Sequence, residues 1–171
     1  MNLSYREHLP ASFDASSRVW IYQCNRIFSV TEALQLQHIF DEFVLDWKSH
    51  GTPVKGFAGL FFGQFIIVMA DETAAGVSGC STDSSVHMIK EIEKVFGVNL
   101  FDRQSLAFVI KDKIQLLPIA QFIYAIQNNF ITADSLYFNN LVSTKEELFK
   151  SWIIPVRESW LAKKLVPKET I

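Results

Sequence analysis

Residues Phe65–Ala70 read Phe-Ile-Ile-Val-Met-Ala and are apolar at every position. Successive side chains of a β-strand point to opposite faces of its sheet, so a strand of this kind has to be covered on both sides. The run is far shorter than the roughly 20 apolar residues that span a bilayer. The sequence therefore predicts a soluble, layered domain with this strand at the centre of its sheet.

Six elements are predicted in the first two thirds of the chain, in the order strand, helix, strand, strand, helix, strand. They are a strand at residues 17–24, a helix between Ser29 and Gly51, strands at Val54–Phe61 and Phe65–Ala70, a helix between Ser81 and Gly97, and a strand at Leu106–Ile110. Ser29 and Glu32 form a capping-box pattern, and apolar residues recur at helical spacing after it. This order predicts an α+β fold with ferredoxin-like, or split βαβ, topology.

The remaining residues extend this core. The predicted elements are a hairpin strand at Ile114–Leu117, a helix at Ile119–Gln127, a short strand at Leu136–Phe138 and a helix capped by Ser143 and Glu146. No linker rich in proline, glycine or serine separates them from the core. We therefore expect a single domain over residues 1–171, with a core at 17–118 and a C-terminal extension, 119–171, packed on it.

The charge balance limits the classes of partner. The chain has 16 basic and 18 acidic residues and a formal net charge of -2, so no overall field draws it to nucleic acid or anionic lipid. Cys24 and Cys80 are the only cysteines and are widely separated, which is typical of reduced thiols. The first ten residues contain no apolar run of a secretory signal. The sequence thus predicts a cytoplasmic protein without a nucleic-acid partner or a membrane span.

Three runs of the sequence resemble a known family. They are Arg18–Gln23, Ser78–His87 and Phe138–Val142, of which Cys-Ser-Thr-Asp-Ser-Ser-Val-His at residues 80–87 is the most specific. They resemble a family of small uncharacterised bacterial proteins whose members often carry the label "ABC transporter ATPase". The resemblance spans the chain from about Arg18 to Trp160. It implies no established activity, cofactor or catalytic residue.

The ATPase label conflicts with the residues present. Nucleotide hydrolases hold the phosphates in a glycine-rich loop that is followed by Lys and Ser or Thr. The nearest match, residues 51–56, is followed by Phe57 and Ala58, and Pro53 removes one backbone N–H donor. The strand Phe65–Ala70, followed by Asp71 and Glu72, resembles a Walker B strand. The sequence has no phosphate-binding loop that could act together with it. The sequence therefore predicts that the chain does not hydrolyse ATP.

Polar residues near the predicted strand ends form a candidate anion site. If the first and third strands are parallel neighbours, their carboxyl ends meet at one edge, close to a helix start that offers free N–H groups. The residues expected there as ligands for an anion are Arg26, Ser81, Thr82, Ser84 and Arg103. The alternative is that the hydroxyl residues only cap the helix.

Cys80 is the candidate nucleophile, with His87 as its base. A thiol at a helix N-terminus has a lowered pKa and is reactive as the thiolate. The alternatives are that Cys80 fills space as a small apolar side chain and that His87 is merely exposed. Asp71, Glu72, Asp83 and His87 offer metal-ligand types without a diagnostic spacing, so no metal and no cofactor are expected.

Two functions remain open from the sequence. The first is a binding or interaction module for an anionic small molecule or a protein partner, and the second is a small enzyme that uses Cys80 as a nucleophile or redox thiol. Split βαβ domains leave one sheet face without helices, and here that face is apolar. We expect the C-terminal segment, a homodimer or both to cover it.

Overall fold

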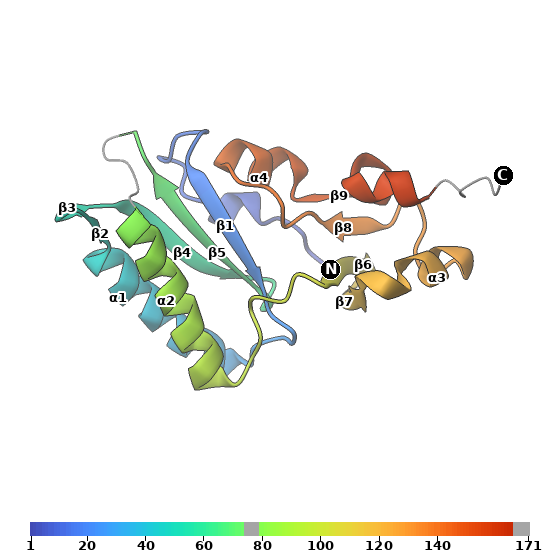
Figure 1. The fold of residues 1–171 in the computed structure, drawn as a ribbon, viewed down its shortest axis with the longest axis horizontal. Helices are drawn as coiled ribbons and strands as arrows, with labels where there is room; N and C mark the ends of the chain where they lie inside the picture. The colour runs from blue at the N-terminus through green and yellow to red at the C-terminus, as the bar shows by residue number, and fades with distance from the viewer. Residues whose placement is uncertain (74–78, 166–171) are drawn as a thin grey trace. The chain divides into compact units, whose positions relative to one another are not determined.

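The computed structural model describes residues 1–73 and 79–165, without the side chain of Cys80. These residues form two compact units. One unit contains Ser4–Asp102 and Asn140–Phe149, and the other contains Met1–Leu3, Arg103–Asn139 and the residues from Lys150 onward. Both units combine helices with antiparallel strands (Figure 1), which confirms the predicted α+β class. The expectation of a single domain stays a prediction.

The first unit is built on a three-stranded antiparallel sheet with the order β1-β5-β4. The strands are β1 (Arg18–Gln23), β4 (Lys55–Phe61) and β5 (Phe65–Asp71). β5 is central and buried along its whole length, as its apolar sequence predicts. Because β1 and β4 both run antiparallel to β5, they are parallel to each other, and the connection between them contains helix α1 (Val30–Asp46). This is a split βαβ arrangement.

The predicted parallel pairing of the first and third strands is wrong. β1 and β5 are neighbours, but they run antiparallel, with Arg18 opposite Ala70 and Gln23 opposite Phe65. The physical reason is that the α1 crossover returns β4 parallel to β1, and the tight hairpin at Phe62–Gln64 then reverses the chain. The next strand, β6, belongs to a different sheet, so the full ferredoxin-like topology is not confirmed.

Helices α1 and α2 (Gly79–Phe96) lie on one face of this sheet (Figure 1). The predicted capping box is confirmed, since the side chain of Ser29 accepts from the N–H of Glu32 and the carboxylate of Glu32 accepts from the N–H of Ser29. The layer between helices and sheet includes Leu36, Phe40, Ile66, Val68, Ala70, Ile89 and Ile92, all buried. No helix among the described residues is long and apolar enough to cross a membrane.

A close contact explains why strand β4 has a glycine at position 56, although glycine weakens the prediction of a strand from the sequence. A Cβ atom at this position would lie 2.4 Å from Cε3 of Trp47, far inside van der Waals contact. Trp47 follows α1 and is 2% exposed, with its indole N–H donating to the carbonyl of Ser81 at 2.9 Å. Strand β4 therefore needs a glycine here so that the indole ring can lie against its backbone.

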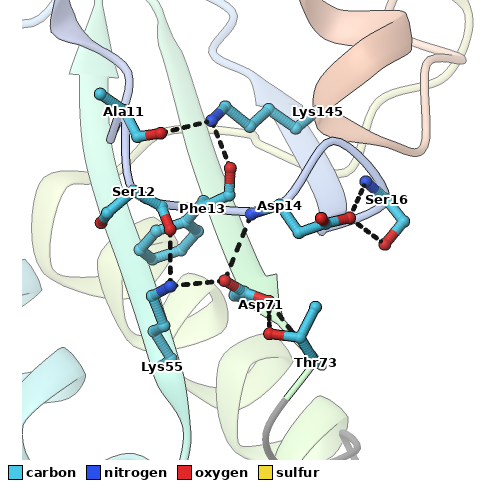
Figure 2. Close-up of polar contacts among 9 residues, drawn as sticks. All are labelled: Ala11, Ser12, Phe13, Asp14, Ser16, Lys55, Asp71, Thr73 and Lys145. Atoms are coloured by element: carbon cyan, nitrogen blue, oxygen red, sulfur yellow. Dashed lines mark hydrogen bonds and ion pairs between the residues drawn. The ribbon is translucent and has the colours of Figure 1, made fainter.

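The opposite face of the sheet is also covered. Phe65, Ile67 and Met69 are fully buried there, although neither long helix lies on this side. Residues 11–14, the end of an N-terminal strap that we define as residues 5–14, lie against the strands with the ring of Phe13 turned toward them (Figure 2). The ammonium group of Lys145 holds the strap through the carbonyl of Phe13 at 2.5 Å. The face is therefore buried within one chain, and a homodimer is not needed to cover it.

Helix α4 (Lys145–Ser151) begins one residue later than a cap at Ser143 predicts. Thr144 Oγ1 accepts from the N–H of Glu147, and the carboxylate of Glu147 bonds the N–H and hydroxyl of Ser143. Glu147 thus takes the role that the sequence pattern assigned to Glu146. Adjacent serine, threonine and glutamate residues fit the same spacing in two registers, which is why the pattern alone did not distinguish them.

The second unit contains a four-stranded antiparallel sheet with the order β7-β6-β8-β9. Its strands are β6 (Ser105–Ile110), β7 (Lys113–Pro118), β8 (Leu136–Phe138) and β9 (Ile153–Pro155). Helix α3 (Phe122–Gln127) packs on it through Phe122, whose ring stacks on that of Phe108 with 6.0 Å between centroids. Among the described residues, the remaining short elements are β2 (Lys48–Ser49), β3 (Thr52–Pro53) and four 3-10 helices at Arg6–His8, Ile119–Gln121, Val156–Glu158 and Trp160–Lys164.

Candidate functional site

An open groove of about 880 Å³ lies between the C-terminal end of α1 and the first turns of α2. Its residues come from both helices and from the segment that follows α1. The apolar ones are Ile39, Phe43, Trp47 and Met88, the charged ones are Glu42, Asp46, Lys48 and Asp83, and Ser84 and His87 complete the lining. The groove lies entirely within the first unit. We call it the α1–α2 groove.

Trp47 sets the shape of the α1–α2 groove. Its indole N–H bonds the carbonyl of Ser81, which ties the end of α1 to the first turn of α2. Its ring also contacts Phe43, with 4.8 Å between centroids, and Trp20, with 6.5 Å. Because the ring is buried and its one donor is used, the apolar floor is held in a fixed position.

The rim of the α1–α2 groove is acidic. Glu42, Asp46 and Asp83 are exposed, and Lys48 is the cation among the lining residues. Three carboxylates and one ammonium group leave a net charge of -2 when His87 is neutral. Asp46 also stands at the C-terminal end of α1, where the helix dipole adds negative potential. The rim therefore favours a cationic ligand.

The predicted site residues of α2 have different surroundings. The helix begins at Gly79, so Ser81, Thr82 and Ser84 lie in its first turns and not in a loop. Ser81 is buried and Ser84 is exposed in the groove. His87 is exposed in the same groove, which agrees with the interpretation of a solvent-facing histidine.

Arg26 is engaged elsewhere. Its guanidinium bonds both oxygens of Glu32, at 2.8 and 2.9 Å, and the carbonyl of Phe96 at 2.9 Å. Phe96 ends α2, whereas Ser84 lies near its start, and their separation of 12 positions corresponds to about 18 Å of helix. Arg103 is exposed and belongs to the other unit. The expected convergence at one edge is wrong, because the antiparallel pairing of β1 and β5 puts their carboxyl ends at opposite edges.

The Arg26–Glu32 pair predicts a loss of stability in acid. The Arg26 guanidinium, together with the Ser29 N–H, holds the pKa of Glu32 at about 2, below its ordinary value of 4.5. A carboxyl group whose pKa is depressed in the folded state stabilises the fold at pH values above its ordinary pKa. This contribution is lost as the pH falls toward about 2. Urea unfolding at a series of pH values measures this effect. In the Glu32→Gln variant, the free energy of unfolding should decline less steeply below pH 4.5 than in the parent. Glu91→Gln, an exposed control on α2, should leave it unchanged.

Asp71 forms a polar cluster beneath the N-terminal strap (Figure 2). Its carboxylate accepts from Lys55 Nζ at 2.6 Å, from Thr73 Oγ1 at 2.7 Å and from the backbone N–H groups of Thr73 and Asp14 at 3.1 and 3.2 Å. Only 2% of the residue is exposed. The Lys55 bond and the Thr73 bonds hold the pKa of Asp71 well below its ordinary value. The cluster fixes the strap to the end of β5.

This cluster gives no support to a Walker B role. The oxygens of Asp71 that would bind magnesium are already hydrogen-bonded, and Glu72 pairs with Arg18 at 3.5 Å. Within the described residues, no group of three or more His, Cys, Asp or Glu side chains is placed to hold a metal ion. The side chain of Cys80 lies outside the described residues, so its role as a nucleophile with His87 stays a prediction. Cys24, by contrast, is fully buried, and burial raises the pKa of its thiol.

The groove carboxylates on α1 were missed by sequence reasoning. Glu42 and Asp46 are one turn apart on the exposed side of a predicted helix, a spacing more often found on solvated surfaces. What makes them part of a groove is the neighbouring start of α2, and this contact depends on Trp47. The signal that could have found it is the combination of Trp47 at the predicted end of α1 with Gly56 in the next long strand, because a glycine lets the indole ring approach the backbone.

Comparisons with protein families, curated proteins and solved structures found no match to this chain. The family resemblance seen in the sequence therefore stays a prediction, together with the cytoplasmic localisation.

Proposed function

We propose that this protein is an interaction module whose α1–α2 groove binds a basic, partly apolar segment of a partner protein. The observation that supports the proposal is the combination of an apolar floor with an acidic rim in one groove of about 880 Å³. Apolar side chains of a bound segment would cover the partly exposed Ile39 and Phe43, and its lysine or arginine side chains would lie near the rim carboxylates.

The charge of the rim favours one of the two occupants that the sequence left open. An anionic small molecule would meet Glu42, Asp46 and Asp83 with Lys48 as the opposing charge, and Arg26 is bound to Glu32. Like charges at close range cost binding free energy, whereas opposite charges speed association and select the partner. A basic protein segment is therefore the better-supported occupant. A catalytic role through Cys80 has no comparable support from a described contact.

A peptide titration tests this function. The probe is a fluorescein-labelled peptide of alternating leucine and lysine, and its binding is measured by fluorescence anisotropy. A labelled peptide of alternating leucine and glutamate is the negative control. We expect saturable binding of the lysine peptide only, weakening with added salt because the rim charges are exposed. The double variant Asp46→Asn/Asp83→Asn should bind about tenfold more weakly, since two exposed charge contacts together contribute about 1.4 kcal/mol.

The control keeps the same change in net charge outside the groove. Glu7→Gln/Glu91→Gln also removes two exposed carboxylates, neither of which lines the groove. Its affinity for the lysine peptide should stay within about twofold of the parent, because distant exposed charges are screened. Equal weakening in both double variants would assign the binding to overall charge and contradict a specific groove.

A further inference from the structure

We propose that the partner segment bound in the α1–α2 groove is a basic amphipathic helix that also covers the neighbouring surface of α1. This inference rests on the proposed function and extends its binding surface. A second hollow, of about 530 Å³, lies along α1 and is lined by Leu34, Gln37, His38, Asp41, Glu42 and Leu45. Glu42 lines both this hollow and the α1–α2 groove, so the two adjoin. We call the second one the outer α1 hollow.

The charge of the outer α1 hollow favours a basic occupant. Asp41 and Glu42 are its carboxylates, and none of its lining residues is a lysine or an arginine. Helix α1 as a whole, Val30–Asp46, contains neither residue type. A second copy of this surface would bring four carboxylates together, whereas lysine or arginine side chains of another protein would lie opposite them. Charge complementarity therefore identifies a basic segment of another protein as the occupant.

The outer α1 hollow also offers apolar contact near both of its ends. Leu34 is 70% exposed and Leu45 is 81% exposed. They are 11 positions apart on α1, which corresponds to about 16 Å of helix, and the two carboxylates lie between them in the sequence. A partner with apolar side chains at this separation and cations between them matches that order. The hollow thus continues the combination of apolar and acidic residues that defines the α1–α2 groove.

The arrangement of the lining residues favours a helical partner over an extended one. From Leu34 to Leu45 they recur at intervals of three and four positions, so they form a stripe along the axis of α1. Side chains of a second helix pack into the grooves beside such a stripe. The backbone groups of α1 are bonded within the helix, so an extended segment finds no strand edge here with which to pair. A helical segment needs none, because it bonds its own backbone internally.

Two labelled peptides of equal composition test the form of the partner. Each has about 14 residues of leucine and lysine, enough for a helix of about 21 Å that reaches from Leu34 to Asp46. In the first peptide the leucines recur at helical spacing, and in the second they alternate with lysine. Measured by fluorescence anisotropy, the first peptide should bind about tenfold more tightly than the second. Its circular dichroism should show helix formation on binding.

Substitutions in the outer α1 hollow locate the bound helix. Leu34→Ser and Leu45→Ser should each weaken binding of the helical-spacing peptide about tenfold, because each removes a leucine that the peptide buries. Leu141→Ser is the matched control, since Leu141 is 68% exposed and lines neither hollow. Its affinity for the peptide should stay within about twofold of the parent. Circular dichroism spectra of the variants check that α1 remains folded.

The outcomes separate this inference from the proposed function. If Asp46→Asn/Asp83→Asn weakens peptide binding but Leu34→Ser and Leu45→Ser do not, the α1–α2 groove binds alone and only the inference is wrong. If the leucine variants weaken binding and the double variant does not, the groove is not part of the site and both proposals are wrong. An alternating peptide that binds as tightly as the helical-spacing peptide would overturn the inference. A parent chain whose sedimentation shows a dimer that Leu34→Ser dissociates would overturn it as well, because a second copy would then occupy the hollow.

Discussion

Asp71→Ala is expected to lower the free energy of unfolding by about 3 kcal/mol, because it removes a buried carboxylate that accepts several hydrogen bonds and pairs with the partly exposed Lys55. The variant removes an acceptor of four hydrogen bonds and leaves the Lys55 ammonium group and two backbone N–H groups without this partner. It also releases the N-terminal strap from the end of β5, which exposes part of the buried sheet face. Urea unfolding near neutral pH measures the change.

Glu72→Ala is the matched control for this prediction. Glu72 is the next residue along the chain, and its ion pair with Arg18 is partly exposed, with side-chain exposures of 34% and 45%. The expected loss is within about 0.5 kcal/mol, because exposed ion pairs contribute little. Equal losses from Asp71→Ala and Glu72→Ala would contradict the structural role of the Asp71 cluster. In acid the Asp71→Ala variant should approach the parent, because the stabilising contribution of Asp71 is lost as the pH falls from its ordinary pKa of 3.8 toward its depressed folded-state pKa.

Gly56→Ala is expected to cost about 2 kcal/mol of stability, although it adds a single methyl group. The new Cβ would lie 2.4 Å from Cε3 and 2.8 Å from Cζ3 of Trp47. The indole cannot turn away without losing its bond to the Ser81 carbonyl and its buried position. Thermal and urea unfolding of the variant measure the cost.

Two further variants isolate the steric cause. Gly79→Ala adds the same methyl group at a position where nothing lies within 4 Å, and it should leave stability nearly unchanged. In a Trp47→Leu background the six-membered ring is absent, so Gly56→Ala should cost less than it does in the parent. Additive losses in the double variant would show that the two residues do not interact and would contradict the contact.

The local parts of the fold could be predicted from the sequence. The capping box at Ser29, the buried strand at Phe65 and the hairpin at Gly63 depend on residues that are close together in the chain. Such signals act through backbone preferences and periodicity, which one sequence displays directly. They predicted the type and approximate bounds of most elements.

The non-local parts could not be predicted in the same way. Whether β6 pairs with β1 or with β8 depends on contacts between distant segments, and its continuous apolar run, Leu106–Ile110, fits either sheet. The partners of Arg26 and Asp71 are also set by tertiary contacts: Phe96 for the first and Lys55 for the second. The expected convergence of Arg26 with the start of α2 was wrong for this reason, because it depended on an assumed strand direction.

Amide chemical-shift mapping tests the central claim, that the α1–α2 groove is the binding surface, most directly. The ¹⁵N-labelled full-length protein is titrated with the leucine–lysine peptide at low salt. The account predicts that the largest shifts fall on Asp46, Lys48, Asp83 and His87 and on the indole N–H of Trp47, with little change in strands β6 and β7. Shifts of the largest size confined to other surfaces, or none at peptide saturation, would contradict it.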